Sequence, residues 1–390
     1  MKAVRYVLMV GVIGAAFACG SFGADSESTP LAVEAGAPDA DAAVLDAASA
    51  DSGAPCVAGT VATDPHHCGR CGHDCLGGAC DKGRCVPLVV AASQPEVRSI
   101  AVDNKEAVWV TSILSGQILA CSHAGCGGAP TALATGIPFP RGVAVAPGNV
   151  FWTEPMTADI SRCVRSTCAS SKTLMNSTGG GDEIATDKTT VWATRGGGGQ
   201  AITTCSIATS VCTVTTNANG GPPGRLAAAN GVAFFTSPAG ELRRIVGAAG
   251  TISDVLDGAS RIAGAFGIAA APDGSKAFFV NTTTGVISTA VVGPGAAQVP
   301  SVALITTATP QSIAFDGKAL YWTTFGQNGL AGSVSSCDPT TSSTCTSTLV
   351  ELATGVRPYA IALDDVSVYY STLGTSAAVM DGAVMRVAKP

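Results

Sequence analysis

The residues of this chain whose types and spacing could do chemistry are charged, aromatic and amide side chains at one recurring place in the sequence. Each lies just before a short apolar run or just after the aromatic run that follows it. Arginine and tyrosine contribute strongly to interfaces, and loops on a rigid scaffold often carry function. The binding candidates are Arg98, Arg141, Glu154, Asp182, Arg195, Phe266, Gln311 and Tyr359. We expect them to form a mixed ring around a ligand site; solvated loop charge is the alternative.

Residues suited to catalysis or metal binding are scarce in the same region. Residues 86–390 contain one histidine, His123, which we expect on the outer rim. The one adjacent acidic pair on the binding face is Asp182 with Glu183, and neighbouring residues of a strand point to opposite sides. Asp-Asp and Asp-Gly dipeptides, such as Asp364-Asp365 and Asp316-Gly317, fit tight turns on the opposite face. The sequence therefore predicts no catalytic residue, no metal site and no cofactor.

These positions belong to a repeated unit whose clearest copy is Pro310 to Thr324, PQSIAFDGKALYWTT. It has an apolar strand, an Asp-Gly turn and an aromatic second strand, and glycine accepts the positive φ that such a turn requires. Seven copies recur at intervals of about 41 to 48 residues, the length of a four-stranded propeller blade. Their second-strand aromatic residues are Trp109, Phe151, Trp192, Phe234, Phe278, Tyr321 and Tyr369. The predicted fold is all-β, a seven-bladed β-propeller over residues 86–390, with a small disulfide-rich N-terminal module and a disordered tether.

The two ends of the repeat region complement each other. The last copy stops after its third strand, Gly382 to Val387, whereas the segment before the first copy matches the junction that precedes the last one almost position for position. We therefore predict that residues 86–93, with a strand from Pro87 to Ala92, supply the outer strand of the last blade. Such pairing closes the ring and removes an exposed edge.

The hairpins resemble the YWTD and NHL classes of propeller repeat and, in blade number, the streptogramin-lyase propellers. YWTD propellers usually have six blades, and the fourth letter of the motif differs here. That position holds Ser112, Glu154, Arg195, Ser237, Thr324 and Thr372. The streptogramin-lyase and lactonase likenesses imply histidine or clustered carboxylate ligands near the channel, which this sequence lacks.

The first 18 residues have the features of an export signal: a basic start, an apolar run and a small-residue end, and they are too short for a membrane span. Ala-Phe-Ala-Cys then resembles a bacterial lipobox, in which Cys19 is lipidated and becomes the mature N-terminus. Setting Cys19 aside leaves an even number of the 15 cysteines to pair. We expect a lipid-anchored protein of the bacterial envelope, in the outer membrane, with simple secretion as the alternative.

Residues 19–55 are rich in Ala, Asp, Ser, Gly and Pro and contain no Lys or Arg. Such a segment cannot bury a core, so a disordered tether is expected. It carries most of the charge imbalance of the chain, whose formal net charge is −6. The part that follows is close to neutral, and we expect no nucleic-acid partner and a monomer.

Residues 56–85 form a cysteine-rich module with Gly-rich turns. Its cysteines are Cys56, Cys68, Cys71, Cys75, Cys80 and Cys85. The stretch Asp64 to Cys75 resembles the cysteine-rich repeat of the stigma-specific proteins. A zinc site from Cys68, Cys71, His73 and Cys75 is the alternative, but disulfides are expected in an exported chain of so little apolar sequence, with their connectivity open.

Four cysteine pairs recur within the propeller at one place in the repeat, between the third and fourth strands. These pairs are Cys121 with Cys126, Cys163 with Cys168, Cys205 with Cys212, and Cys337 with Cys345. Each would close a short loop and stabilise the outer hairpin by about 2 kcal/mol. Regular repetition in four blades favours a structural role over a redox role.

The resulting functional hypothesis is an envelope-anchored, non-catalytic binding lipoprotein that holds a protein, peptide or glycan at the channel face of the propeller. The alternative is a propeller-type lyase or hydrolase acting at the central channel.

Overall fold

In a computed structural model of the protein, Ala54–Pro390 form one compact unit. The structure describes residues 56, 59–123, 125–177, 181–195, 199–217, 223–237, 240–247, 250–256, 265–292, 302–307, 309–326, 331–340, 344–375 and 381–390. The predicted export signal, Cys19 and the acidic tether lie outside these residues. In the described part of the chain, no helix is long and apolar enough to cross a bilayer.

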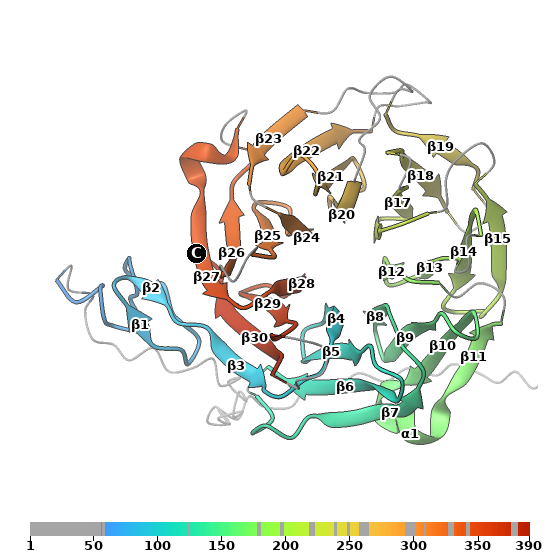
Figure 1. Ribbon diagram of the computed structural model, residues 1–390, viewed down its shortest axis with the longest axis horizontal. Coiled ribbons are helices and arrows are strands. Elements are labelled where there is room, and N and C mark those ends of the chain that lie inside the picture. Colours follow the sequence, from blue (N-terminus) through green and yellow to red (C-terminus); the bar gives the residue numbers. More distant parts are fainter. Residues whose placement is uncertain are drawn as a thin grey trace, which may run out of the picture. The chain divides into compact units, whose positions relative to one another are not determined.

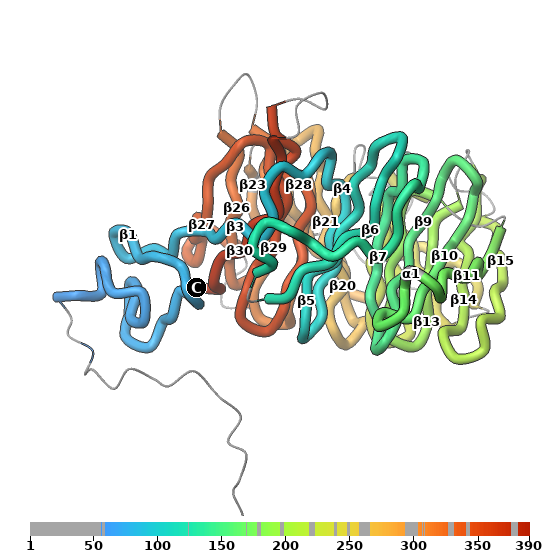
Figure 2. The backbone as a smooth tube through the Cα atoms, turned by 90° about the horizontal axis from the view of Figure 1, so that it is seen from below, coloured from blue at the N-terminus to red at the C-terminus, as the bar shows by residue number. Residues whose placement is uncertain are grey.

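Seven four-stranded antiparallel sheets surround a central channel, as predicted (Figure 1). Seen edge-on in Figure 2, the strands run between the two faces of the ring. The innermost strand of each blade contacts the innermost strands of both neighbouring blades, so the first strands line the channel.

Each blade has four strands, which follow one another from the channel outward. Blade 1 contains β4 (Val97–Val102), β5 (Glu106–Thr111), β6 (Gly116–Ser122) and β7 (Thr131–Ile137). Blade 2 contains β8 (Val143–Ala146), β9 (Asn149–Glu154), β10 (Asp159–Val164) and β11 (Thr173–Asn176). Blade 3 contains β12 (Ile184–Thr186), β13 (Thr190–Thr194), β14 (Ala201–Ser206) and β15 (Cys212–Thr216). Blade 4 contains β16 (Leu226–Ala229), β17 (Val232–Thr236), β18 (Leu242–Val246) and β19 (Ile252–Asp254). Blade 5 contains β20 (Ala265–Ala270), β21 (Lys276–Asn281), β22 (Val286–Val291) and β23 (Val302–Thr306). Blade 6 contains β24 (Pro310–Phe315), β25 (Leu320–Thr324), β26 (Gly332–Cys337) and β27 (Val350–Gly355). Blade 7 contains β28 (Pro358–Leu363), β29 (Ser367–Thr372), β30 (Ala383–Ala388) and β3 (Leu88–Ala91).

The hydrophobic core lies between neighbouring blades rather than at the centre of the ring. The repeated aromatic residues of the second strands are all buried, none more than 2% exposed. Between blades 1 and 7, for example, Trp109 and Leu119 share one buried cluster with Tyr369 and Val384. Burial of large rings at each seam explains why the second strand of every blade carries an aromatic residue.

The hairpin turn between the first two strands is held by its own aspartate. In blade 6 the Asp316 carboxylate accepts the backbone N–H groups of Lys318 and Ala319 at 2.9 and 2.8 Å. Gly317 has a φ of 97°, which residues with a side chain rarely adopt. These contacts show that Asp316 stabilises its own turn.

The ring closes through the N-terminal strand. β3 pairs with β30 in antiparallel register, with Leu88 opposite Arg386 and Val89 opposite Met385. The outer strand of blade 7 thus comes from the segment that the sequence places there, and the two ends of the propeller share one sheet. Within β3, Val90 and Ala91 are buried.

The four cysteine pairs predicted within the propeller are disulfides in the structure, and the six cysteines of the module form three more. The bonds join Cys121–Cys126, Cys163–Cys168, Cys205–Cys212, Cys337–Cys345, Cys56–Cys71, Cys68–Cys80 and Cys75–Cys85. Two of the linking loops contain short helical turns that the all-strand pattern did not predict: η1 (Arg165–Thr167) with α1 (Cys168–Ser171), and η2 (Cys345–Thr348).

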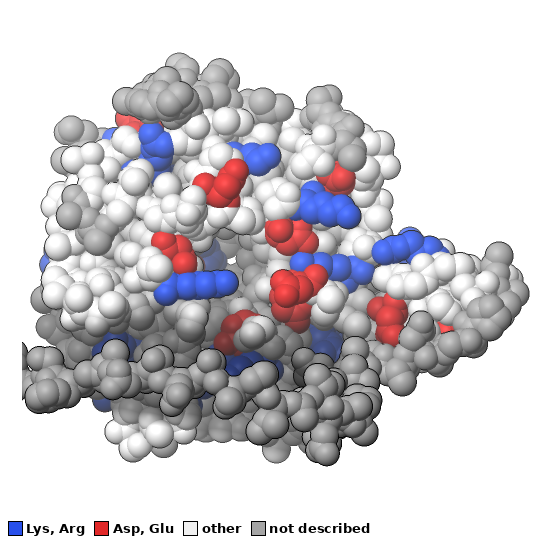
Figure 3. All heavy atoms as spheres, turned by 180° about the vertical axis from the view of Figure 1, so that it is seen from behind, with Lys and Arg blue, Asp and Glu red and all other residues white. Residues whose placement is uncertain are grey.

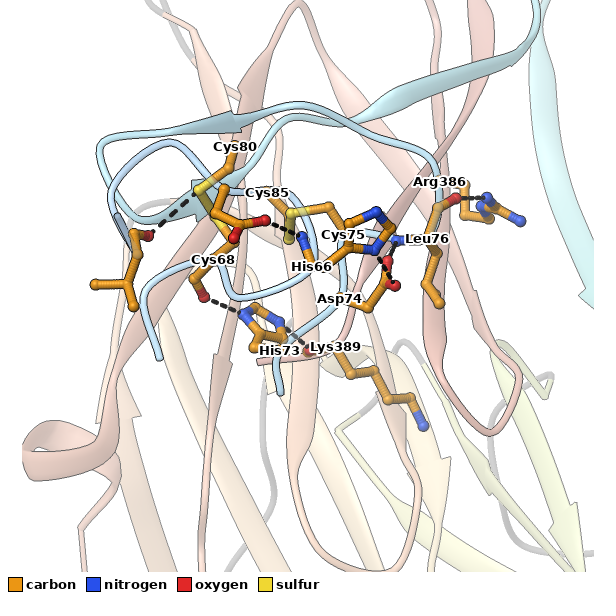
Figure 4. Close-up of a disulfide and its surroundings, with 12 residues drawn as sticks. His66, Cys68, His73, Asp74, Cys75, Leu76, Cys80, Cys85, Arg386 and Lys389 are labelled. Carbon is orange, nitrogen blue, oxygen red and sulfur yellow. Dashed lines mark hydrogen bonds and ion pairs between the residues drawn. A yellow bond between two sulfur atoms is a disulfide. The ribbon is translucent and has the colours of Figure 1, made fainter. Parts of the chain in front are cut away.

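The cysteine-rich module, with its small hairpin of β1 (Cys80–Asp81) and β2 (Arg84–Cys85), packs against the last two blades. Figure 4 shows two polar links. The His73 ring contacts the Lys389 carbonyl oxygen at 2.8 Å, and Arg386 donates to the Leu76 carbonyl oxygen at 2.6 Å. His73 also contacts the Cys68 carbonyl, and the sulfur atoms of the alternative zinc set are all in disulfides. The module therefore secures the C-terminal strand.

Candidate functional site

The channel-facing side chains are positioned by irregularities at the start of the innermost strands. In four blades the pairing of the first two strands shifts register at this point, between Val97 and Ser99, Ala265 and Ile268, Pro310 and Ile313, and Pro358 and Ile361. A bulge leaves one residue outside the ladder and turns its side chain away from the sheet face. The side chains at this point therefore leave the strand in a different direction from those that follow. They belong to Arg98, Phe266, Gln311 and Tyr359.

The hydroxyl residue near the end of the aromatic strand has a specific role at the start of the first strand. Its side-chain hydroxyl accepts a hydrogen bond from a backbone N–H of the first strand's start in four blades. The pairs are Gly142 with Thr153 (3.0 Å), Glu183 with Thr194 (3.1 Å), Ser312 with Thr323 (3.1 Å) and Ala360 with Ser371 (3.0 Å). A buried N–H that has left the ladder needs such an acceptor. The repeated Thr or Ser thus stabilises the backbone that presents the channel residues.

A cavity of about 330 Å³ lies at the channel. Its lining residues are Arg98, Arg141, Asp182, Glu183, Gly224, Arg225, Phe266 and Tyr359. Five of the residues expected to form a binding ring are therefore brought together from blades 1, 2, 3, 5 and 7. Cavities that hold small ligands begin at about this size.

A contact across the channel organises the cavity. The Arg225 guanidinium, from blade 4, donates to the Tyr359 hydroxyl of blade 7 at 2.8 Å. A second nitrogen of Arg225 forms an ion pair with Glu183 of blade 3, and the guanidinium lies 4.2 Å from the ring centre of Phe266 in blade 5. One side chain thus connects four blades, two of them on opposite sides of the ring.

Each arginine that lines the cavity has a carboxylate partner. Arg98 pairs with Glu96 at 2.7 Å, Arg141 with Asp182 at 3.8 Å, and Arg225 with Glu183. Figure 3 draws the opposite face of the ring, that of the first hairpin turns, where acidic and basic side chains also lie close to one another. The site is rich in charge but balanced.

In the Glu183–Arg225 pair both side chains are largely enclosed, 20% and 23% exposed. Burial raises the pKa of the Glu183 carboxyl above its usual value, while Arg225 opposes that shift. Burial alone would lower the pKa of Arg225, but the charge of Glu183 and the contact with Tyr359 raise it. Each partner therefore depends on the other to keep its charge inside the protein.

Aromatic and arginine side chains continue beside the cavity. The ring of Phe325 meets that of Tyr359 edge-on at 6.3 Å, and the Arg357 guanidinium lies 4.8 Å from the Phe325 ring centre. Arg98 lies 5.7 Å from the ring centre of Tyr359. With Phe266 of blade 5, aromatic rings and guanidinium groups are thus found at this face from blade 5 to blade 7.

The remaining three candidates lie outside the cavity. Arg195 is exposed and does not line the cavity. The Gln311 side chain donates a hydrogen bond to the Thr309 carbonyl oxygen at 3.4 Å. Glu154 was expected to bind a ligand, and that role conflicts with its position. It is buried and accepts from Trp152 Nε1 at 2.8 Å and Lys172 Nζ at 2.9 Å.

Burial opposes ionisation of Glu154, but its hydrogen-bond donors outweigh burial and lower the pKa of its carboxyl. The acidic residue at the end of this strand therefore neutralises a lysine and satisfies a buried indole N–H.

Two residues that line the cavity, Glu183 and Arg225, were not among the predicted binding residues. The expectation that Asp182 and Glu183 point to opposite sides was wrong, because both precede β12 and both line the cavity. Arg225 was not proposed at all. A signal existed: this second position of the repeat is small in five blades, as in Ser99 and Gly142, but carries opposite charges in the adjacent blades 3 and 4.

His123 does not lie on the outer rim as expected. Its ring centre lies 5.4 Å from that of the buried Tyr369, and its Nδ1 lies 3.4 Å from an Asp364 oxygen. The side chain reaches into the seam between blades 1 and 7, away from the residues that line the cavity.

Comparison with known proteins connects the chain with solved structures alone: no protein-family model and no curated protein matches it. Virginiamycin B lyase from Staphylococcus aureus superposes with a TM-score of 0.59 at 15% identity, over 78% of this chain and 99% of that chain. A streptogramin B lyase gives 0.58 at 16% identity, over 78% and 96%. A catalytically inactive His→Ala variant of the Staphylococcus aureus enzyme with quinupristin gives 0.58 at 16%, over 78% and 99%. At these identities the likeness shows that the chain shares the propeller fold of these lyases.

Proposed function

We propose that this protein is a non-catalytic binding protein that holds its ligand in the channel cavity. The observation that carries the proposal is the cross-channel assembly of Arg225, Tyr359, Phe266 and Glu183 beside Arg98. Arginine and aromatic side chains in an enclosed site are those that contribute most to binding. The two carboxylates that line the cavity are engaged by arginines, an arrangement that suits recognition better than proton transfer.

A lyase or hydrolase is the second candidate. Glu183 favours it, because an enclosed carboxyl with a raised pKa is suited to acid–base chemistry. The fold is shared with lyases, but the inactive variant among them lacks one histidine, and no described residue lining this cavity is a histidine. Turnover by the purified protein that Glu183→Gln abolishes, in a variant that circular dichroism shows to be folded, would favour this candidate over binding.

Site-specific crosslinking in the native envelope tests the binding function. A photoreactive residue at exposed Arg141 should give one defined adduct, identified by mass spectrometry, whereas one at exposed Asp365, in a hairpin turn, should not. Substituting Arg98→Ala and Tyr359→Ala in the same protein should reduce that adduct at least 10-fold, or about 1.4 kcal/mol of binding free energy. Circular dichroism would verify that the variant is folded. An adduct that forms equally at both positions, or survives both substitutions, would contradict binding in the cavity.

We also propose that the protein is exported and anchored through lipidated Cys19, with the acidic segment as a tether. The supporting observations are the lipobox-like sequence and the complete pairing of the other 14 cysteines in disulfides. Attached acyl chains together give stable anchoring. Cys19→Ala should therefore move the protein from the membrane fraction to the soluble fraction. Retention of the processed variant in membranes would argue against the anchor.

A further inference from the structure

We propose that the ligand of the cavity is an uncharged saccharide, one or two sugar rings at the end of a neutral glycan. This inference rests on the proposed binding function and specifies its ligand class. It follows from the charge balance, the hydrogen-bonding groups and the aromatic rings of the cavity, and from its volume.

The charge balance disfavours an ionic ligand. The arginines Arg98, Arg141 and Arg225 are matched by Glu96, Asp182 and Glu183. A bound anion would have to compete with a carboxylate already in place, and a bound cation with a guanidinium. At the Glu183–Arg225 pair, either would leave a charge uncompensated inside the protein, which is unfavourable. A ligand without net charge avoids this penalty.

Hydroxyl groups match the donors and acceptors that such pairs present. Guanidinium groups only donate hydrogen bonds, and ionised carboxylates only accept them. A hydroxyl does both, so two neighbouring hydroxyls of a sugar can bridge an arginine and its carboxylate without breaking the ion pair. Charge-assisted hydrogen bonds of this kind are the stronger ones. Arg141 and Asp182 are the pair most open to such bridging, with side chains 43% and 63% exposed and 3.8 Å apart.

The apolar part of the cavity suits the C–H face of a sugar ring. Phe266 and Tyr359 both line it and are half-buried, and Arg225 fixes their positions by stacking on Phe266 and by a hydrogen bond to Tyr359. Preorganised rings lose little conformational entropy when a ligand binds. A volume of about 330 Å³ admits a small ligand or the end of a chain rather than a folded partner.

Binding of defined saccharides to the full-length protein tests the proposal. The probes are the neutral disaccharides cellobiose, maltose, lactose and chitobiose, with glucuronate and galacturonate as charged counterparts, measured by calorimetry or ligand-observed NMR. We expect at least one neutral disaccharide to bind while both uronates bind at least 10-fold more weakly. Its affinity should change less than 2-fold between about 0.05 M and about 0.5 M NaCl, because salt screens interactions between exposed charges. Preferential, salt-sensitive uronate binding would overturn the inference.

Two substitutions at Phe266 separate ring recognition from general apolar packing. Phe266→Leu should lower the affinity for the disaccharide about 10-fold, whereas Phe266→Tyr should keep that affinity within about 2-fold of the unaltered protein. Asp365→Asn, in an exposed turn, is the control and should bind as the unaltered protein does. Equal affinity of the Leu and Tyr variants would contradict the stacking argument.

Failure of this inference can be told apart from failure of the binding function. If no disaccharide binds, but crosslinking at position 141 still gives an adduct that Arg98→Ala and Tyr359→Ala abolish, the cavity binds another class of ligand and the saccharide proposal is wrong. If neither saccharide binding nor a cavity-dependent adduct is found, both proposals are wrong.

Discussion

Val90→Asp should destabilise the propeller by about 3 kcal/mol or more, whereas Val89→Asp in the same strand should change stability by less than about 0.5 kcal/mol. Val90 is 5% exposed and Val89 is 57% exposed, and the pairing of β3 with β30 shifts register between Val89 and Ala91. The two substitutions are identical and occupy neighbouring positions. Their difference therefore measures how much the N-terminal strand contributes to the last blade.

The expected effect is large because β3 closes the ring. Val90 and Ala91 belong to the buried cluster that contains Trp109 and Tyr369, which come from the first and last blades. A charge placed there would be buried without a partner, and detachment of the strand would expose the edge of β30. Either response weakens the seam where the two ends of the chain meet.

Chemical denaturation of the purified protein measures both variants. A truncation provides the complementary test: a chain that starts at Val97 should unfold at lower denaturant concentration than one that starts at Val86. Both truncated chains lack the cysteine-rich module, so the comparison isolates residues 86–96, which contain β3. Equal midpoints for the two chains, or equal effects of the two Asp substitutions, would show that closure by β3 is not important for stability.

Much of the fold is predictable because the repeat is carried by few, strongly constrained positions. The motif aromatic is buried at every seam, as Trp192 and Phe278 illustrate, and substitution there would leave a large cavity. The Asp-Gly turn likewise admits few alternatives, since Gly317 has a positive φ. Periodicity and turn chemistry are local properties, and they suffice to count blades and place the closing strand.

The site was only partly predictable because it depends on contacts between distant residues. Alignment of the repeats brings Arg98 and Tyr359 to equivalent positions, but it does not say which side chain spans the channel. Arg225 does so, reaching a residue 134 positions away in the sequence. Glu154 differs from its prediction for the same reason. Its position in the motif suggests exposure, but its carboxylate is buried in contacts with Lys172 and Trp152. Docking of the cysteine-rich module through His73 also had no local signal.

Glu183→Gln is expected to destabilise the protein by about 3 to 5 kcal/mol, because it leaves the enclosed charge of Arg225 without its counterion. Asp182→Asn is a matched control one residue earlier. Its side chain is 63% exposed and 3.8 Å from Arg141, so its loss should have an effect below about 1 kcal/mol. Both substitutions replace a carboxylate by its amide, so volume is preserved in each.

The double variant Glu183→Leu with Arg225→Met separates charge compensation from the value of the ion pair. Replacing both partners by apolar residues of similar size should restore stability to within about 1 kcal/mol of the unaltered protein, since no buried charge remains. The same variant should lose cavity binding, because the hydrogen bond to Tyr359 and the stacking on Phe266 disappear. Denaturation midpoints together with the crosslinking yield from position 141 would measure the two effects.

If Glu183→Gln were no more destabilising than Asp182→Asn, the charge of Arg225 would be compensated by water or another group, and the cross-channel pair would not organise the site. A stable double variant that still bound its ligand would place recognition on the outer arginines rather than on this pair.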